Sequence, residues 1–220
     1  MYTVDLTGKN ALIFGVANHR SIAWAIAQAL YGAGAKVALT YQTERLKEGV
    51  EELATEIGNA PLFQCDVSID GEVEELYKKV GETMGNLSTV VHSIAFAHRD
   101  DLGGEFSKTE REGFRIALDV SAFSLIPVVR YAAPLMADGG NIIAMTFLAG
   151  EKVFPGYNVM GVAKAALENS VKQLAAEFGP NNIRVNAISA GPLDTLSSRV
   201  ITGYRDMKRI HQERAPMARN

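Results

Sequence analysis

A tyrosine and a lysine seven positions apart are the residues best suited to chemistry in this chain. Tyr157 and Lys164 stand in a segment whose pattern predicts the start of a buried helix. Because seven residues make nearly two helical turns, both side chains leave one face and can reach one ligand. The lysine charge lowers the cost of hydrogen-bond or proton donation by the phenol, and the ammonium can also bind a sugar hydroxyl. The pair suits chemistry on a carbonyl beside a nucleotide, although the spacing alone also fits a packed ring and a solvated cation.

The composition restricts the class of protein. With 220 residues, of which 47% are hydrophobic and 21% charged, the chain is expected to form one domain over residues 1–220. A net charge of −3 and four scattered histidines indicate neither a nucleic-acid partner nor a metal site. The single Cys65 excludes an internal disulfide and fits a small apolar filler in a reducing cytoplasm.

The sequence shows no membrane or export signal. No apolar run approaches the roughly 20 residues that span a bilayer, and the N-terminus lacks a charged leader followed by an apolar stretch. We therefore expect a cytoplasmic protein that does not bind membranes.

Short apolar runs rich in β-formers alternate with longer segments of helical spacing, which predicts an α/β fold with a doubly wound, mostly parallel sheet of the Rossmann type. Such a sheet binds its ligands beyond the carboxyl ends of the strands. The expected strands are 11–14, 37–41, 62–65, 90–93, 142–145 and 183–188, and the expected helices are 22–32, 45–57, 72–84, 114–136 and 162–178.

The turn after the first strand is a candidate phosphate site. Gly15 begins this turn, and Ser21 and Ile22 open the next helix. The free N–H groups and the positive dipole end of that helix favour a pyrophosphate. The usual G-x-G-x-x-G spacing is absent, and Ser21 alone fits a helix N-cap equally well.

The ends of the next strands should meet the rest of a dinucleotide. Gln42 follows the second strand and can bond ribose hydroxyls, but it cannot neutralise a 2'-phosphate. This residue favours NADH over NADPH, whereas the nearby Arg45 favours NADPH. Asp66 and Val67 follow the third strand, where the carboxylate either accepts from adenine or caps the next helix.

Small residues follow the fourth strand. Ser93 and Ile94 begin this segment, in which small side chains allow the backbone to approach a cofactor. We therefore count both residues as candidate cofactor contacts.

Together these residues resemble the enoyl-acyl-carrier-protein reductases of bacterial fatty-acid synthesis, a divergent branch of the short-chain dehydrogenase/reductase superfamily. The resemblance extends from about Leu6 to Asn220. In the commoner superfamily members a tyrosine stands four residues before the lysine, where this chain has Met160, and the Tyr-x6-Lys spacing is that of the enoyl reductases. The segments that carry the resemblance are 15–23, 93–97, 157–164 and 183–192.

The resemblance implies a mechanism. Hydride moves from NADH to the β-carbon of a trans-2-enoyl thioester on acyl-carrier protein, and Tyr157 donates a hydrogen bond to the enolate oxygen. Lys164 holds the nicotinamide ribose, and Gly191, Leu193 and Thr195 close over the cofactor. The residues expected to line the acyl tunnel, each of which also fits an ordinary core position, are Phe96, Ala97, Leu102, Met160 and Tyr204.

Three differences from the family pattern stand out. Phe147 occupies the position of a second tyrosine in most bacterial members, so that hydroxyl is missing as a proton donor. Asp194 stands where relatives usually have arginine, which should weaken phosphate binding if the side chain faces the ligand. The relatives also continue through another helix and a final strand, which are expected to be missing here, so that the homotetramer they form is in doubt.

Two other functions remain open from the sequence. A ketone or alcohol oxidoreductase of the wider superfamily is disfavoured by Met160 at the usual tyrosine position. A catalytically inactive nucleotide-binding homologue is supported by Phe147 and Asp194.

Overall fold

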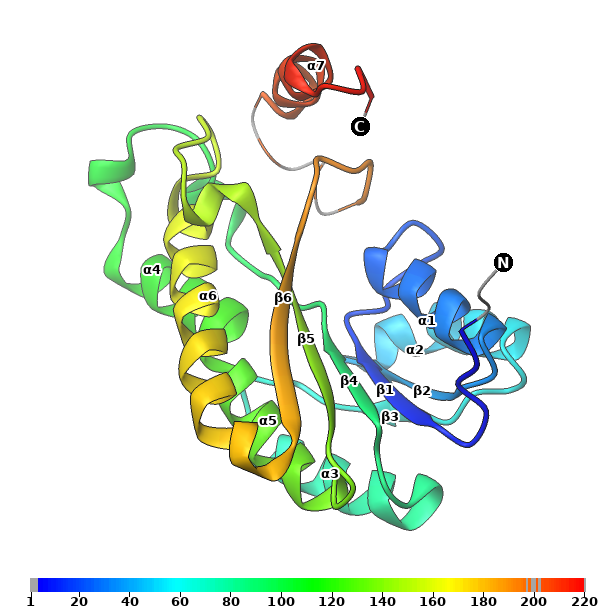
Figure 1. Cartoon of the computed structure of the whole chain (residues 1–220). Helices are drawn as coiled ribbons and strands as arrows, with labels where there is room; N and C mark the ends of the chain where they lie inside the picture. The colour runs from blue at the N-terminus through cyan, green and yellow to red at the C-terminus, as the bar shows by residue number, and fades with distance from the viewer. Residues whose placement is uncertain (1–3, 197, 199–200, 202, 220) are drawn as a thin grey trace.

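Six apolar runs form the strands of one parallel sheet with the order β3-β2-β1-β4-β5-β6 (Figure 1). The computed structural model describes residues 4–196, 198, 201 and 203–219. Each of the six predicted strands is confirmed. Their bounds are β1 (Asn10–Phe14), β2 (Lys36–Tyr41), β3 (Leu62–Gln64), β4 (Thr89–His92), β5 (Gly140–Phe147) and β6 (Ile183–Ala190).

Helices cover both faces of the sheet, because alternate strand residues are apolar on each side. One core lies between the sheet and α3, α5 and α6, and the other lies between the sheet and α1 and α2 (Figure 1). Cys65 is buried in the first core, as the sequence predicts. The helix bounds are α1 (Ile22–Gly32), α2 (Glu44–Glu56), α3 (Asp70–Met84), α4 (Arg111–Leu118), α5 (Leu125–Ala132), α6 (Asn158–Phe178) and α7 (Tyr204–Arg214).

The helix predicted over 114–136 is interrupted by one wider turn. Between α4 and α5 the chain forms a π-helical turn, η3 (Asp119–Phe123), and the Ser124 N–H donates to the Asp119 carbonyl at 3.0 Å. A short 3-10 segment, η4 (Ala133–Leu135), follows α5. The turn places serines of an otherwise apolar segment toward the end of β4, where they bond His92 and Phe96.

The same segment corrects the prediction that no apolar run is long enough to span a bilayer. The continuous helical stretch Arg111–Leu135 has 25 residues, with a window of mean hydropathy 1.5, so by length and composition it passes the test for a membrane span. Half of that window is buried inside the fold, which is the property of a core helix.

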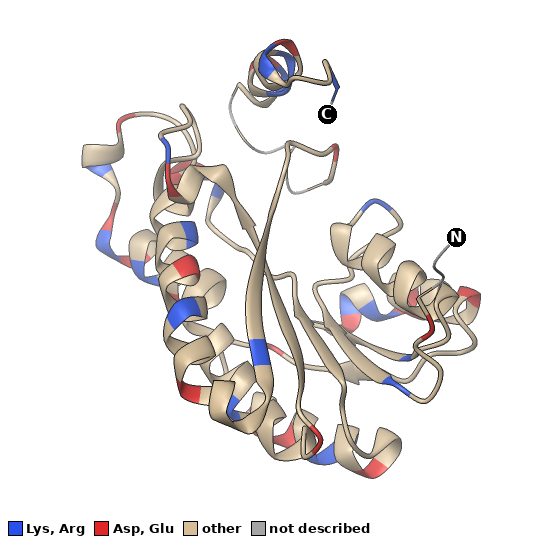
Figure 2. Ribbon diagram, in the orientation of Figure 1, with Lys and Arg blue, Asp and Glu red and all other residues tan. Residues whose placement is uncertain are grey.

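The strand order reverses between β1 and β4, which is where doubly wound sheets bind ligands. The helix α7, which the sequence pattern does not predict, lies beyond the carboxyl end of β6 (Figure 1). Charged residues lie mainly on helices and loops, while the strands are largely free of them (Figure 2). The carboxyl ends of β1, β4, β5 and β6 lie at one edge of the sheet, and α7 lies beyond this edge on the side of β6 (Figure 1).

Candidate active site

Tyr157 lies one residue before α6 rather than within it. It is the N-cap residue of this helix, with helical φ and ψ of −94° and −21°. Its ring meets the Phe147 ring edge-on, with the centroids 5.1 Å apart and the planes at 64°. Phe147 is the last residue of β5 and also contacts Phe154, with centroids 4.9 Å apart. The Phe147 ring thus contacts the Tyr157 ring at the carboxyl end of β5.

Burial keeps the Tyr157 phenol protonated. Desolvation, with the Tyr204 phenol acting in the same direction, raises the pKa of Tyr157 to about 12. The sequence suggests that the lysine charge eases donation by the phenol, but in this structure burial governs the pKa. A neutral phenol at physiological pH is a hydrogen-bond donor.

Lys164 lies on the second turn of α6, seven residues after Tyr157. Its side chain is 5% exposed, and its ammonium Nζ donates to the Met145 carbonyl oxygen at 2.8 Å. Burial lowers the pKa of Lys164 to about 8, although the Glu168 carboxylate opposes this shift. An ammonium has three donor hydrogens, so this bond leaves two for other acceptors.

The turn after β1 approaches the end of β4 very closely. Gly15 has φ +91°, and a Cβ atom there would lie 2.0 Å from the Ser93 carbonyl oxygen. Only glycine fits such an approach. Ser93 and Ile94 are half-buried, and Ile94 packs against the first core. The structure thus brings together Gly15 and Ser93, two of the predicted cofactor contacts.

Ser21 is the N-cap of α1 by position, but its hydroxyl does not cap the helix. The Ser21 Oγ donates back to the Asn18 carbonyl at 2.7 Å, and its side chain accepts no cap bond from the first turn that begins at Ile22. The first N–H groups of α1 therefore keep their capacity to bind an anion.

Gln42 and Asp66 contact each other across the ends of β2 and β3. The Gln42 Nε2 donates to the Asp66 Oδ2 at 2.9 Å, and the Asp66 Oδ1 accepts from the Ser68 N–H and hydroxyl. Desolvation raises the pKa of Asp66, but the hydrogen bonds from Ser68 and Gln42 outweigh it and hold the pKa below its usual value. Asp66 stabilises the turn before α3 rather than the helix itself, which has Ile69 as its N-cap, and Val67 beside it is buried.

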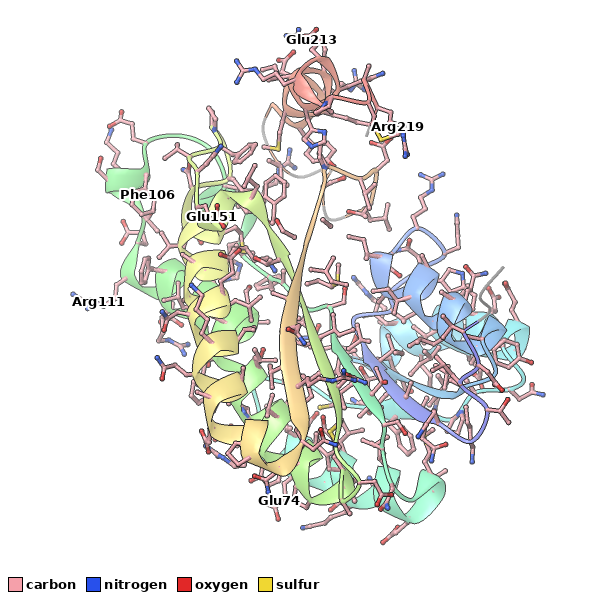
Figure 3. The ribbon with its side chains drawn as sticks, viewed as in Figure 1. Glu74, Phe106, Arg111, Glu151, Glu213 and Arg219 are labelled. Carbon is pink, nitrogen blue, oxygen red and sulfur yellow. The ribbon has the colours of Figure 1, made fainter. Side chains whose placement is uncertain are left out.

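The segment after β6 is tied to α7. Tyr204, the first residue of α7, donates from its hydroxyl to the Leu193 carbonyl. Asp194 forms an ion pair with Lys208 of α7, so its charge is compensated although its side chain is 67% exposed. The Thr195 N–H donates to the Ser198 Oγ at 3.0 Å. In Figure 3, Glu213 lies on α7, and Glu151 lies near the start of α6.

Gly191 lies beside the candidate catalytic residues. Ala190, the residue before it, pairs with Phe147 in the sheet register. Gly191 itself is exposed and directly follows β6. The segment that begins at Gly191 therefore leaves the sheet next to the Phe147–Tyr157 ring pair.

The predicted acyl-site residues lie on three segments: the loop after β4, the first turn of α6 and the start of α7. Phe96 is 46% exposed and Met160 is 5% exposed, and both contact the Ser121 Oγ. Ala97 and Leu102 are half-buried in the loop after β4. The residue after Leu102, Gly103, accepts a hydrogen bond from the Asn158 side chain at the start of α6. Tyr204 is the first residue of α7, and its hydroxyl bonds the Leu193 carbonyl.

Sequence reasoning missed three polar residues behind this site. Ser121 and Ser124 are fully buried, and His92 at the end of β4 is fully buried with its Nε2 2.8 Å from the Ser124 Oγ. Serines within an apolar helical pattern were the available signal, because a buried hydroxyl requires a partner. Among the described residues, no group of three or more His, Cys, Asp and Glu could hold a metal ion.

Comparisons with known proteins show the family of this chain. The sequence profile of the enoyl-(acyl carrier protein) reductase family matches residues 15–220. An enoyl-[acyl-carrier-protein] reductase [NADH] of Bacillus subtilis is 47% identical over 98% of this chain and 84% of its own length. An enoyl-[acyl-carrier-protein] reductase [NADPH] of Staphylococcus aureus is 48% identical over 99% of this chain and 86% of its own length.

Solved structures give the same result. The Bacillus cereus enoyl-acyl carrier protein reductase, crystallised with NADP+ and indole naphthyridinone, superposes with a TM-score of 0.95 at 49% identity, over 98% of this chain and 85% of that one. The Aquifex aeolicus enoyl-[acyl-carrier-protein] reductase (NADH) superposes with a TM-score of 0.94 at 43% identity, over 97% of this chain and 84% of that one. This chain therefore belongs to the enoyl-(acyl carrier protein) reductase family.

Proposed function

We propose that this protein reduces the carbon–carbon double bond of trans-2-enoyl thioesters carried on acyl-carrier protein, with NADH as the electron donor. The observation that carries the proposal is the placement of the Tyr157 phenol against Phe147 at the carboxyl end of β5, with the buried Lys164 ammonium seven residues later in α6. This is the donor pair that the reduction of a conjugated thioester needs.

The structure fits a dinucleotide cofactor at three points. Gly15 allows the backbone after β1 to approach the end of β4 without a side chain in the way. The first N–H groups of α1 are free of a Ser21 side-chain cap and can bind a pyrophosphate. Lys164 keeps donor hydrogens beyond its bond to Met145, and these can bind ribose hydroxyls.

When bound, reduced nicotinamide supplies a hydride to the β-carbon of the enoyl thioester. Tyr157 then donates a hydrogen bond to the thioester oxygen, on which negative charge collects, and this contact is stronger in the transition state than in the ground state. Because burial raises the pKa of Tyr157 to about 12, the phenol retains its proton for this role. Phe147 has no hydroxyl, so the proton that reaches the α-carbon comes from solvent or by another route and not from this position.

The environment of Gln42 supports NADH over NADPH. Gln42 is exposed at the end of β2 and is bonded to the Asp66 carboxylate, whose pKa is held below its usual value. A negative charge beside Gln42 disfavours a 2'-phosphate, whereas an amide and a carboxylate both accept bonds from ribose hydroxyls. Arg45 on α2 is the nearest contrary residue, and relatives named for NADH and for NADPH both occur.

The function is tested by following the oxidation of NADH and NADPH with a short and a long trans-2-enoyl thioester. We expect consumption of both enoyl substrates with NADH, and a lower kcat/KM with NADPH. An acetoacetyl thioester serves as the ketone comparison. Turnover of the ketone alone would show a ketone reductase, and NADH binding without any turnover would show an inactive homologue.

The proposal extends to location and assembly. We place the enzyme in the cytoplasm, without membrane or nucleic-acid partners, as a homo-oligomer whose number of subunits is to be measured. The exposed residues of β6, which forms one edge of the sheet and includes Ile188 at 46% exposure, support association through this side. Light scattering of the purified chain measures the oligomeric state.

A further inference from the structure

The π-helical turn η3 brings two fully buried serines against the segment that follows β4. Turns of this kind widen a helix by one residue and often occur at functional sites. Ser121 lies within the turn, and Ser124 directly follows it. Because a buried hydroxyl without a hydrogen-bond partner is costly, the partners of these two serines identify the segment that the turn stabilises.

Ser121 bonds both backbone groups of one loop residue. The Phe96 N–H donates to the Ser121 Oγ at 2.9 Å, and the Ser121 hydroxyl donates to the Phe96 carbonyl at 3.0 Å. The Met160 Sδ lies 3.8 Å from the same oxygen. Phe96 belongs to no strand or helix. The Ser121 side chain therefore bonds the backbone N–H and carbonyl that a neighbouring strand would bond in a sheet.

Ser124 holds the other end of the same segment. Its hydroxyl donates to the Val120 carbonyl at 2.7 Å, so the 2.8 Å contact with His92 is donated by the histidine Nε2. Residues 92 to 96 are therefore fixed at His92 by Ser124 and at Phe96 by Ser121. The first anchor lies beside Ser93 and the close approach of Gly15, and the second lies on the acyl side.

We propose that Ser121 is a positioning residue for the acyl chain: it fixes the Phe96 backbone against Met160, so that the exposed Phe96 ring forms one wall of the thioester site. The inference rests on the proposed enoyl reductase function. Because Ser93 is anchored independently through β4, His92 and Ser124, loss of the Ser121 hydroxyl disturbs the acyl side and spares the cofactor side. Phe96 is 46% exposed and its ring packs edge-on against His98, with centroids 5.3 Å apart.

The test uses the full chain with Ser121→Ala, and with Ser121→Cys, which keeps the side-chain size but is a weak hydrogen-bond acceptor. For both variants we expect the KM for a long enoyl thioester to rise about tenfold, as follows from losing one to two hydrogen bonds. The kcat and the dissociation constant for NADH stay within about twofold. Ser170→Ala is the matched control, because it removes a half-buried hydroxyl that bonds only within α6, and it should leave all three values unchanged.

Amide hydrogen exchange at Phe96 gives a readout that does not depend on activity. We expect faster exchange there in both Ser121 variants and no change in Ser170→Ala. If the wild-type protein reduces no thioester, the proposed function fails, and exchange at Phe96 still decides whether Ser121 holds this segment. Unchanged KM and unchanged exchange would overturn the inference, as would an equal loss of NADH affinity, kcat and thermal stability, which indicates general structural support.

Discussion

The Lys164 ammonium lies 2.8 Å from the Met145 carbonyl oxygen, in a position where only 5% of the lysine is exposed. This bond fixes the end of a flexible side chain between β5 and α6. Burial lowers the pKa of Lys164 to about 8, so at pH 7 the group still carries its charge. Burying a cation is costly, and the bond to Met145 leaves two donor hydrogens of this ammonium for other acceptors. We therefore infer a functional rather than a stabilising role for Lys164.

Lys164→Met is expected to remove most of the activity while the fold is kept. Methionine has nearly the same length and no charge, so the change removes the charge-assisted bonds to the cofactor without creating a cavity. We expect kcat/KM to fall roughly 100-fold, since hydrogen bonds to charged groups contribute about 1.5–3 kcal/mol each. Steady-state kinetics and an NADH titration measure the effect, and the melting temperature checks the fold.

Lys172→Met is the matched control, because Lys172 is an exposed lysine on the same helix. It should leave kcat/KM and NADH affinity at the wild-type values. Equal activity of Lys164→Met and wild type would remove Lys164 from the mechanism.

Tyr157→Phe and Phe147→Tyr separate the two aromatic positions. The first change keeps the ring contact at 5.1 Å and removes only the hydroxyl, so kcat should fall about 100- to 1,000-fold, the usual cost of one donor to a developing oxyanion. The second adds a hydroxyl beside the phenol and should change kcat less than tenfold, or under about 1.4 kcal/mol. Kinetics with a saturating enoyl thioester measure both. If the two variants and wild type have equal kcat, the catalytic assignment is wrong.

Most of the sheet and its ligand edge could be predicted from the sequence. Runs such as 11–14 and 142–145 are apolar on both faces, which is diagnostic of buried parallel strands, and the predicted α1 has the observed bounds Ile22–Gly32. The rule that ligands lie beyond carboxyl ends then places Gly15, Ser93 and Tyr157 at one edge.

Other features could not be predicted, for physical reasons. The helix α7 is polar on nearly every side, with only Met207 buried, so it carries no apolar stripe. The π-helical turn η3 differs from the flanking helices in its backbone hydrogen bonds and not in its residue types, so the sequence pattern does not reveal it. The bond between Gln42 and Asp66 depends on the register of two strands, and Tyr157 lies outside α6 because Asn158 adopts φ +35°, a conformation that no spacing rule foresees.

Gly15→Ala is expected to impair both stability and cofactor binding. The new Cβ would lie 2.0 Å from the Ser93 carbonyl oxygen, and φ is +91°, so the end of β4 must move. We expect the free energy of unfolding to fall by about 1–3 kcal/mol, the usual cost of such backbone strain. NADH affinity should fall with it, because the two cofactor segments separate. Urea unfolding and an NADH titration measure the two effects.

Gly71→Ala is the control for this substitution. Gly71 lies in α3, and a Cβ added there would meet no neighbouring atom within 4 Å, so alanine should leave NADH binding unchanged and keep or raise stability. Wild-type NADH affinity in Gly15→Ala would contradict the role given to the close approach.

His92→Gln is expected to make the protein less sensitive to acid. Burial, with the Lys164 charge acting in the same direction, lowers the pKa of His92 to about 3 in the folded state, whereas the ordinary value is 6.5. Between these two values the unfolded chain binds a proton that the folded chain does not, so stability is lost as pH falls. The slope approaches about 1.4 kcal/mol per pH unit for one proton. Glutamine cannot titrate, and its amide can still donate to the Ser124 Oγ.

Urea unfolding at several values of pH from 7 down to about 4.5, the window in which an ordinary histidine gains its proton, measures the difference, with exposed His19→Gln as the control. The His92→Gln variant should lose less stability than wild type over this range, and His19→Gln should follow wild type. The assignment is sharpened by Ser124→Ala, which leaves the His92 Nε2 without its partner and should lower stability at neutral pH as well. An acid dependence in His92→Gln as steep as that of wild type would contradict the assignment, because His92 would then not be the group whose protonation lowers stability in this range.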